Sequence, residues 1–124
     1  MGTHPSIMIV GDTARWHESA ETAITHALSC ACEIRKRHDL IDALSELIDH
    51  PNDIDLIVVA NQLGQRNDGL RLALELTESD DPPLIIYSNC IDGPSRRAAE
   101  AEGATVIAFD PVLLERAVQQ LLPT

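Results

Sequence analysis

The stretch Asp55-Leu-Ile-Val-Val-Ala60 decides the fold class of this chain of 124 residues. Its apolar residues run without interruption, and turn-forming or polar segments bound the run at 50–53 and 61–68. A strand with one wet face alternates apolar and polar residues, whereas a continuous apolar run is typical of a parallel strand buried on both faces. The stretch therefore predicts the middle of a parallel sheet that helices cover on both sides.

Outward from this strand, short apolar runs alternate with segments of helical periodicity. We expect strands at 7–10, 29–36, 55–60, 84–88 and 105–109, and helices at 13–28, 39–48, 70–76, 92–102 and 111–121. The second helix carries one apolar stripe of Leu40, Ile41, Leu44, Leu47 and Ile48. This alternation predicts one doubly wound α/β domain over residues 1–124, a flavodoxin-like (βα)5 sandwich whose five-stranded parallel sheet has the order 2-1-3-4-5.

The composition excludes several classes of function. Nine basic and 20 acidic residues give a net charge of −11, which repels nucleic acids and anionic membranes. The aromatic residues are Trp16, Tyr87 and Phe109, too few to stack nucleotide bases. The sequence has neither a run of about 20 apolar residues nor a signal-peptide pattern, so we expect a cytoplasmic protein.

Five short motifs occur in an order and at a spacing typical of one family. They are IMIVGD at 7–12, DLIVVA at 55–60, DGL at 68–70, PLIIYS at 83–88 and AEGATVIAFDP at 101–111. On these motifs the chain resembles the receiver domain of bacterial two-component response regulators, from Ile7 to Leu122. The resemblance implies the fold predicted above and a role in signal transduction.

The resemblance also implies a phosphorylation pocket at the carboxyl ends of the strands. A receiver holds Mg²⁺ with an acidic pair after its first strand and with an aspartate that ends the third strand and accepts the phosphoryl group. A hydroxyl that ends the fourth strand and a lysine that ends the fifth bind the phosphoryl oxygens. Oxygen ligands suit a hard cation, and positive charge offsets that of the transferred group.

The chain departs from this pattern at the cation and acceptor places. Gly11 stands first in the acidic pair, so only Asp12 is acidic. The acceptor place is Ala60 when counted forward from Asp55, and Asn61 when counted back from Gly69 of the DGL motif, so the loop carries one extra residue. Neither of these side chains forms an acyl phosphate.

The places after the fourth and fifth strands are partly kept. Ser88 supplies the hydroxyl, but Asp110 replaces the lysine and reverses its charge. Ile107 stands where the family has an aromatic residue that changes rotamer on activation. Pro111 is retained, and we expect the family's cis peptide bond between Asp110 and Pro111.

This degenerate pocket predicts neither phosphotransfer nor a catalytic residue. Asp12 and Asp110 would repel a phosphoryl group, by about 4 kcal/mol for one pair of unit charges in contact in a partly screened site. The same two carboxylates are weak candidates for a residual cation site, completed by Asn61 or a backbone carbonyl. The alternatives are that both are solvated, or that Asp110 hydrogen-bonds Ser88. Slow deamidation of Asn61 is another route to an acceptor. No cofactor is expected.

The cysteines and glycines have simple structural interpretations. Cys30 and Cys32 share one side of a predicted strand, but no second ligand pair accompanies them at zinc-finger spacing. We expect both, and Cys90, to be buried thiols. The glycine-bounded segment 64–69 lacks the end of a phosphate-binding loop and is expected to be a turn.

Three features of the charged and aromatic residues concern surfaces. His17 and Glu21 share a helix face and are expected to form a solvent-facing pair. The basic run at 35–37 predicts a solvated loop, or alternatively a contact for an acidic partner. Trp16 lies on an apolar stripe and is expected in the core, with an exposed interface anchor as the alternative.

These observations favour a protein–protein interaction module of bacterial signalling that works without phosphorylation. The partner would be a kinase, an output domain or another regulator, and a homodimer through the fourth and fifth helices is the family-like arrangement. The candidate surface residues are Arg96, Arg97, Glu100, Ile107, Leu114 and Gln119.

Two alternatives remain open. One is a flavodoxin-like domain that senses a small molecule in the crevice at the switch point of the sheet. The other is a receiver that retains a weak response to Mg²⁺ or a phosphoryl group. An enzyme is not expected, because no spacing of residues supports a catalytic site.

Overall fold

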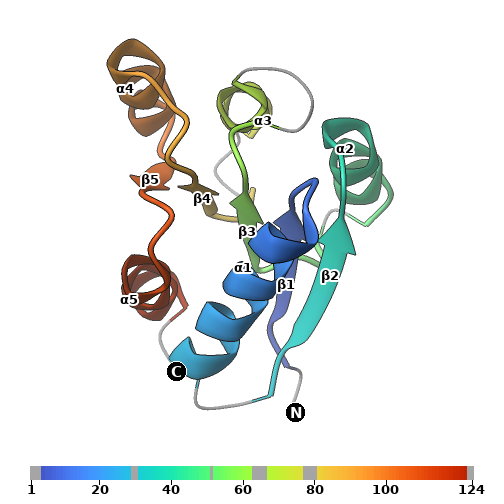
Figure 1. Ribbon diagram of the computed structural model, residues 1–124. Helices are drawn as coiled ribbons and strands as arrows, with labels where there is room; N and C mark the ends of the chain where they lie inside the picture. The colour runs from blue at the N-terminus through green and yellow to red at the C-terminus, as the bar shows by residue number, and fades with distance from the viewer. Residues whose placement is uncertain (1–3, 29–30, 51, 63–66, 77–80, 123–124) are drawn as a thin grey trace.

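Five parallel strands form one sheet between two layers of helices (Figure 1). The computed structural model describes residues 4–28, 31–50, 52–62, 67–76 and 81–122. Along the chain the elements are β1 (Ser6–Val10), α1 (Ala14–Ala27), β2 (Glu33–Arg37), α2 (Leu40–Asp49), β3 (Leu56–Val59), α3 (Asp68–Glu75), β4 (Leu84–Tyr87), α4 (Gly93–Ala101), β5 (Thr105–Ile107) and α5 (Pro111–Leu121). The strand order is β2-β1-β3-β4-β5, which confirms the predicted flavodoxin-like architecture.

Side chains of the central strands alternate between two apolar cores. Ile7 and Ile9 of β1 face α1 and α5, whereas Met8 and Val10 face α2, α3 and α4. All four residues of β3 are fully buried, two in each core. The continuous apolar run at 56–59 therefore forms a strand covered on both faces, as predicted. No helix within the described ranges is long and apolar enough to cross a membrane.

Side-chain oxygens cap the N-termini of four helices. Thr13 Oγ1 accepts a hydrogen bond from the backbone N–H of Trp16, and Asp39, Asp92 and Asp110 cap α2, α4 and α5 in the same way. Each of these contacts satisfies a backbone donor that the first helical turn leaves unpaired. The four caps fix the loops at the carboxyl ends of β1, β2, β4 and β5.

The basic run at 35–37 is not the solvated loop that was expected. It lies within β2, the edge strand, which starts at Glu33 and not at residue 29. Arg35 contacts Glu33 at 2.6 Å and Glu46 of α2 at 2.8 Å, Arg37 also contacts Glu46, and Lys36 contacts Glu21 of α1 at 2.9 Å. The strand carries cations because carboxylates of both flanking helices lie beside it.

Two other expectations differ from the structure. The fifth strand ends at Ile107, and the Phe109 N–H instead donates to Asn89 Oδ1 at 2.9 Å while its ring packs on Tyr87. Cys90 was expected to be buried but is exposed, because it lies in the turn after β4. Cys32 is half-buried. Cys30 lies outside the described residues, as do residues 64–66 of the expected turn at 64–69.

Candidate functional site

The predicted pocket residues gather at the carboxyl edge of the sheet. Parallel pairing brings the ends of neighbouring strands to one edge (Figure 1). The Ala60 N–H donates to the Val10 carbonyl at 2.9 Å, and the Ser88 N–H donates to the Ile107 carbonyl at 3.1 Å. These bonds continue the ladders beyond the strands and set the starting points of the loops that form the site.

The β1–α1 turn is built around a close contact between Gly11 and Trp16. A Cβ atom on Gly11 would lie 2.2 Å from the Cε3 atom of the Trp16 ring, well inside van der Waals contact. Trp16 is buried, and its Nε1–H donates to the Tyr87 carbonyl at the end of β4, at 2.9 Å. With Trp16 in this place, position 11 has no room for a side chain. The expectation that Trp16 belongs to the core is confirmed.

His17 is buried beside this turn, so the expected solvent-facing pair with Glu21 is wrong. Its Nε2 lies 2.6 Å from the Gly11 carbonyl, which only accepts, so Nε2 carries the proton. In the neutral ring Nδ1 is then unprotonated, and it is buried without a hydrogen-bond partner among the described residues. Glu21 pairs with Lys36 instead.

Burial lowers the pKa of His17, and the nearby positive charge of Lys36 and the neighbouring His38 act in the same direction. The His38 ring contacts the His17 ring at a centroid distance of 4.9 Å. The hydrogen bond to Gly11 and the carboxylate of Glu21 oppose the shift in part. His17 is therefore held in its neutral form in the folded chain.

The acceptor place is occupied by residues without a carboxyl group. Ala60 is buried and continues β3 toward the core of α1 and α5. Asn61 follows it and is fully buried; its Nδ2 donates to the Cys90 carbonyl at 2.8 Å and to Asn67 Oδ1 at 3.1 Å. Its Oδ1 has no partner within the described part of the chain and would lie 3.0 Å from a Cβ on Gly69. Asn61 thus ties the end of β3 to the loop after β4 and leaves little free space around itself.

The two predicted pocket residues in the loops after β4 and β5 form local hydrogen bonds. Ser88 Oγ accepts the Cys90 N–H at 3.0 Å, and Asp110 Oδ1 accepts the Val112 N–H at 3.0 Å. The proposed Asp110–Ser88 hydrogen bond is therefore replaced by two local ones. The Asp110–Pro111 bond is trans, contrary to expectation, and Pro111 takes the first position of α5, where proline needs no N–H partner.

The two candidate cation ligands, Asp12 and Asp110, are not arranged as a metal site. Asp12 and Asp110 are both exposed, and Asp110 is committed to the cap of α5. Within the described ranges no three histidine, cysteine or carboxylate side chains group closely enough to hold a metal ion. Two carboxylates alone make a weak site for Mg²⁺.

Tyr87 links the site to the interior. Its ring is fully buried, and its hydroxyl lies 2.8 Å from Ser19 Oγ of α1. Burial raises the pKa of Tyr87, so the phenol stays neutral. Trp16 and Phe109 pack on this ring at centroid distances of 6.0 Å and 4.9 Å. All three aromatic residues of the chain therefore meet beneath the carboxyl edge of the sheet.

The candidate interaction surface is only partly available. Arg96, Arg97, Glu100 and Gln119 are exposed and Ile107 is half-buried, but Leu114 is fully buried. The inward side of α5 packs Leu114 into the core of α1, so it leaves the set of surface residues. Arg96 Nε and Glu100 Oε2 lie 3.4 Å apart, one helix turn along α4.

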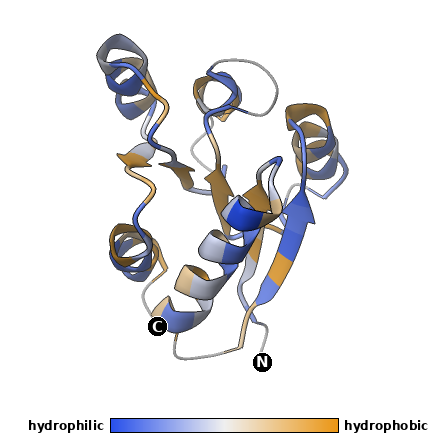
Figure 2. Ribbon diagram, viewed as in Figure 1, coloured by the Kyte–Doolittle hydropathy of each residue, from blue (hydrophilic) through white to orange (hydrophobic). Residues whose placement is uncertain are grey.

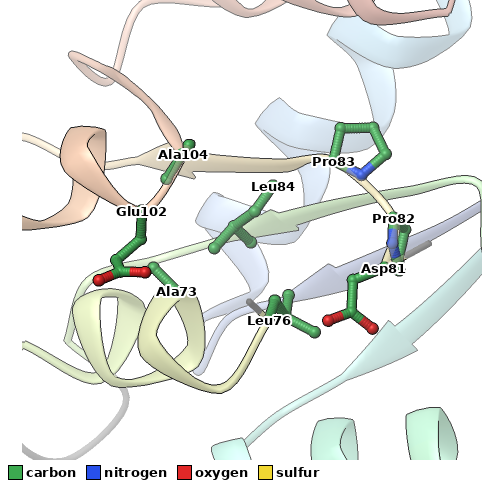
Figure 3. Close-up of a pocket in the computed structure, with 9 residues that line it drawn as sticks. Ala73, Leu76, Asp81, Pro82, Pro83, Leu84, Glu102 and Ala104 are labelled. Atoms are coloured by element: carbon green, nitrogen blue, oxygen red, sulfur yellow. The ribbon is translucent and has the colours of Figure 1, made fainter. Parts of the chain in front are cut away.

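A small cavity lies at the opposite edge of the sheet (Figure 3). It has a volume of about 150 Å³ and is lined by apolar residues where β4 and β5 begin, with the carboxylates of Asp81 and Glu102 at its sides. Ligands of open α/β sheets bind at the carboxyl ends of strands. This cavity therefore does not belong to the candidate site.

Sequence reasoning missed the contact that shapes the site. It treated Gly11 as a lost carboxylate and Trp16 as a separate core residue, although the chain's single tryptophan follows that glycine by five positions. A large ring one turn into the next helix is placed to lie over the turn, because helical side chains tilt toward the N-terminus. That spacing was the available signal.

Known proteins are similar to this chain in structure. No family model matches it, and neither does any curated protein. A putative response regulator from Chloroflexus aurantiacus is 20% identical, with a TM-score of 0.78 over 98% of this chain and 100% of its own. The signal receiver domain of a two-component signal transduction histidine kinase from Clostridium thermocellum is 15% identical, with a TM-score of 0.81 over 98% and 100%. Chemotaxis protein CheY4 of Vibrio cholerae is 16% identical, with a TM-score of 0.75 over 97% and 100%. The chain therefore has the fold of receiver domains.

Proposed function

We propose that this chain is a receiver-like domain of bacterial signal transduction that acts through protein–protein contacts without being phosphorylated. The observation that carries the proposal is the contact between Trp16 and Gly11. A receiver needs a carboxylate at that place to hold Mg²⁺, and here the indole ring excludes any side chain from it. The loss of the carboxylate is thus built into the packing of α1 on the sheet.

The other places of the pocket support the same function. Asn61 is enclosed by hydrogen bonds to Asn67 and Cys90, so its amide acts as a structural tie. Asp110 stands where a lysine would bind the phosphoryl group, and its carboxylate caps α5. A negative charge at this place opposes a phosphoryl group. Receiver domains are signalling modules and not enzymes, and we assign this chain no catalytic residue.

A protein partner is favoured over a small molecule. Beside the switch point of the sheet, between β1 and β3, the side chains of Trp16 and Asn61 are both buried, and each is held by hydrogen bonds to the chain at the end of β4 or just after it. Charged residues of α4, by contrast, are exposed, among them Arg96, Arg97 and Glu100. For such a surface the family-like arrangement is an output domain, or a second copy that binds through α4 and α5; a kinase or another regulator is a further candidate partner.

An NMR titration tests whether phosphorylation has any role. The ¹⁵N–¹H spectrum is recorded with Mg²⁺ and then with beryllofluoride, which stands in for the phosphoryl group. We expect no shifts beyond those of exposed carboxylates, while a receiver with an intact pocket responds under the same conditions. Shifts at Asn61 and Ser88 that spread into β5 and disappear in Ser88→Ala would refute the proposal.

A further inference from the structure

The outward face of α2 carries two isoleucines that the fold leaves uncovered. Ile41 and Ile48 have exposed fractions of 75% and 77%, higher than any other large apolar side chain in the described residues. They are seven positions apart and so lie on the same side of the helix, with the half-buried Leu44 between them. We call Ile41, Leu44 and Ile48 the α2 stripe.

The packing of α2 on the sheet does not explain these residues. The inward face is formed by Ala43 and Glu46, with Leu40, Leu47 and part of Leu44 packed against the core beside them. Ile41 and Ile48 point away from that face and add nothing to the core. An exposed β-branched residue also favours a helix less than alanine, lysine or glutamate would. Helix stability therefore gives no reason for isoleucine at either place.

A line of carboxylates runs beside the α2 stripe. Asp42 and Asp49 each follow one of the isoleucines, so they lie on the adjacent face of the helix, seven positions apart, and both are exposed. Neither forms an ion pair within the described part of the chain.

The cations nearest to this line are already committed. Arg35 and Arg37 of β2 bind the buried Glu46 on the inner side of α2, and Lys36 binds Glu21 of α1. In Figure 2, β2 is mostly hydrophilic and lies beside α2, which carries hydrophobic segments. Within the described part of the chain, the carboxylates of Asp42 and Asp49 are therefore left beside the stripe without a cation bound to them.

A second copy of the chain is a poor occupant for this surface. A two-fold contact that packs the two α2 helices of 10 residues antiparallel would bring Asp42 and Asp49 of one copy against the same aspartates of the other. Each copy also carries a net charge of −11, which opposes association. The surface calls instead for a partner with apolar and basic residues.

We propose that the α2 stripe docks a basic amphipathic helix of a partner protein, with its apolar side chains on Ile41, Leu44 and Ile48 and its lysines or arginines against Asp42 and Asp49. Helix-to-helix contact of this kind uses apolar anchors at i, i+3 and i+7, which is the spacing of the stripe. The inference rests on the proposed function and names one surface for it, on the side of the sheet that holds α2.

The test uses a synthetic probe and NMR. The probe is a helical peptide of leucine and lysine with its leucines on one face, titrated into ¹⁵N-labelled protein. In the wild type we expect chemical-shift changes concentrated on α2. The double variant Ile41→Ser, Ile48→Ser should bind the peptide at least tenfold more weakly. In the double variant Asp42→Asn, Asp49→Asn the affinity for the peptide should depend less on salt concentration. The matched control is Val112→Ser, at an apolar residue 56% exposed on α5, which should leave binding unchanged. Retained spectral dispersion shows that each variant is folded.

Three outcomes overturn the inference. They are the absence of α2 shifts at millimolar peptide, binding that a scrambled peptide of the same composition reproduces, and binding that the isoleucine substitutions do not weaken. A dimer in sedimentation that these substitutions dissolve would assign the stripe to a second copy. Repeating the titration with beryllofluoride tests the proposed function separately from the α2 docking surface. A response of the pocket residues would refute phosphorylation independence, whereas the place where the peptide binds is measured independently of that response.

Discussion

The contact between Gly11 and Trp16 predicts a strong dependence of one substitution on another. Gly11→Ala places a methyl group 2.2, 2.7 and 2.9 Å from three carbons of the indole ring. The backbone at Gly11 is not in the left-handed region, so alanine introduces no strain of its own there. The whole cost of the substitution therefore comes from the collision with Trp16.

The magnitude follows from how firmly the ring is held. Trp16 is buried in the core of α1 and α5 and bonded to the Tyr87 carbonyl, so it cannot simply turn away. Overpacking of this kind lowers the free energy of unfolding by about 1–3 kcal/mol. Trp16→Ala alone removes a buried ring and costs about 3–5 kcal/mol. In the Trp16→Ala background the added methyl group enters vacated space, and Gly11→Ala should cost close to nothing.

A double-mutant cycle measures the coupling. Urea unfolding followed by circular dichroism gives the free energy of unfolding for the wild type, the two single variants and the double variant. We expect a coupling energy of about 1–3 kcal/mol, and a single-variant loss in melting temperature of about 3–6 °C for each kcal/mol in a domain of this size. A coupling energy below about 0.5 kcal/mol would show that Trp16 does not enclose Gly11 and would remove the main support for the proposed function.

Three further predictions concern single contacts. The pKa of His17 is lowered from 6.5 in the folded chain, so the stability that its neutral form contributes should be complete above pH 6.5 and lost as the pH falls through the folded-state pKa. The melting temperature, measured from pH 8 to 5, should therefore depend less on pH in His17→Asn than in the exposed control His26→Asn. Glu46→Gln should lower the free energy of unfolding in urea by about 1–3 kcal/mol, because Glu46 is buried against two arginines. The control Glu100→Gln, at an exposed ion pair, should lower it by less than about 0.5 kcal/mol. Equal losses would contradict the ion-pair assignment. Asp110→Ala should lower stability by about 0.5–2 kcal/mol through loss of the α5 cap, and Asp110→Asn, which keeps an acceptor oxygen, should lose much less.

The fold could be predicted from the sequence because its signals are local and agree with one another. The run at 56–59 and the cap at Asp39 specify a strand and a helix from neighbouring residues alone. The edge strand was the weakest prediction, since β2 is polar and pairs with β1 on one side only, and its Arg35 and Lys36 form ion pairs with residues that are distant along the chain. A pattern of single residues contains no record of such contacts.

The sequence indicated which residues lie near the site but not which hydrogen bonds and packing contacts they form. The sequence places Ser88 and Asp110 at strand ends; in the structure Ser88 directly follows β4, whereas β5 ends at Ile107, three residues before Asp110. The hydrogen bonds that they make depend on turn geometry, which hydrophobic periodicity does not report. His17 was misassigned for the same reason: its helix face is polar by pattern, but the chain of Gly11 folds back over it.

Because the chain has one tryptophan, its ultraviolet emission reports on a single place. That place is the turn beneath the carboxyl edge of the sheet, where the indole ring touches Tyr87 and lies at a centroid distance of 5.5 Å from His17. Excitation of the tyrosine at 6.0 Å passes to the same ring, and the neutral imidazole of His17 lies at its edge. The molecule thus carries its own optical probe at this edge of the sheet, and a partner or cation that reaches the edge can be followed in unlabelled protein.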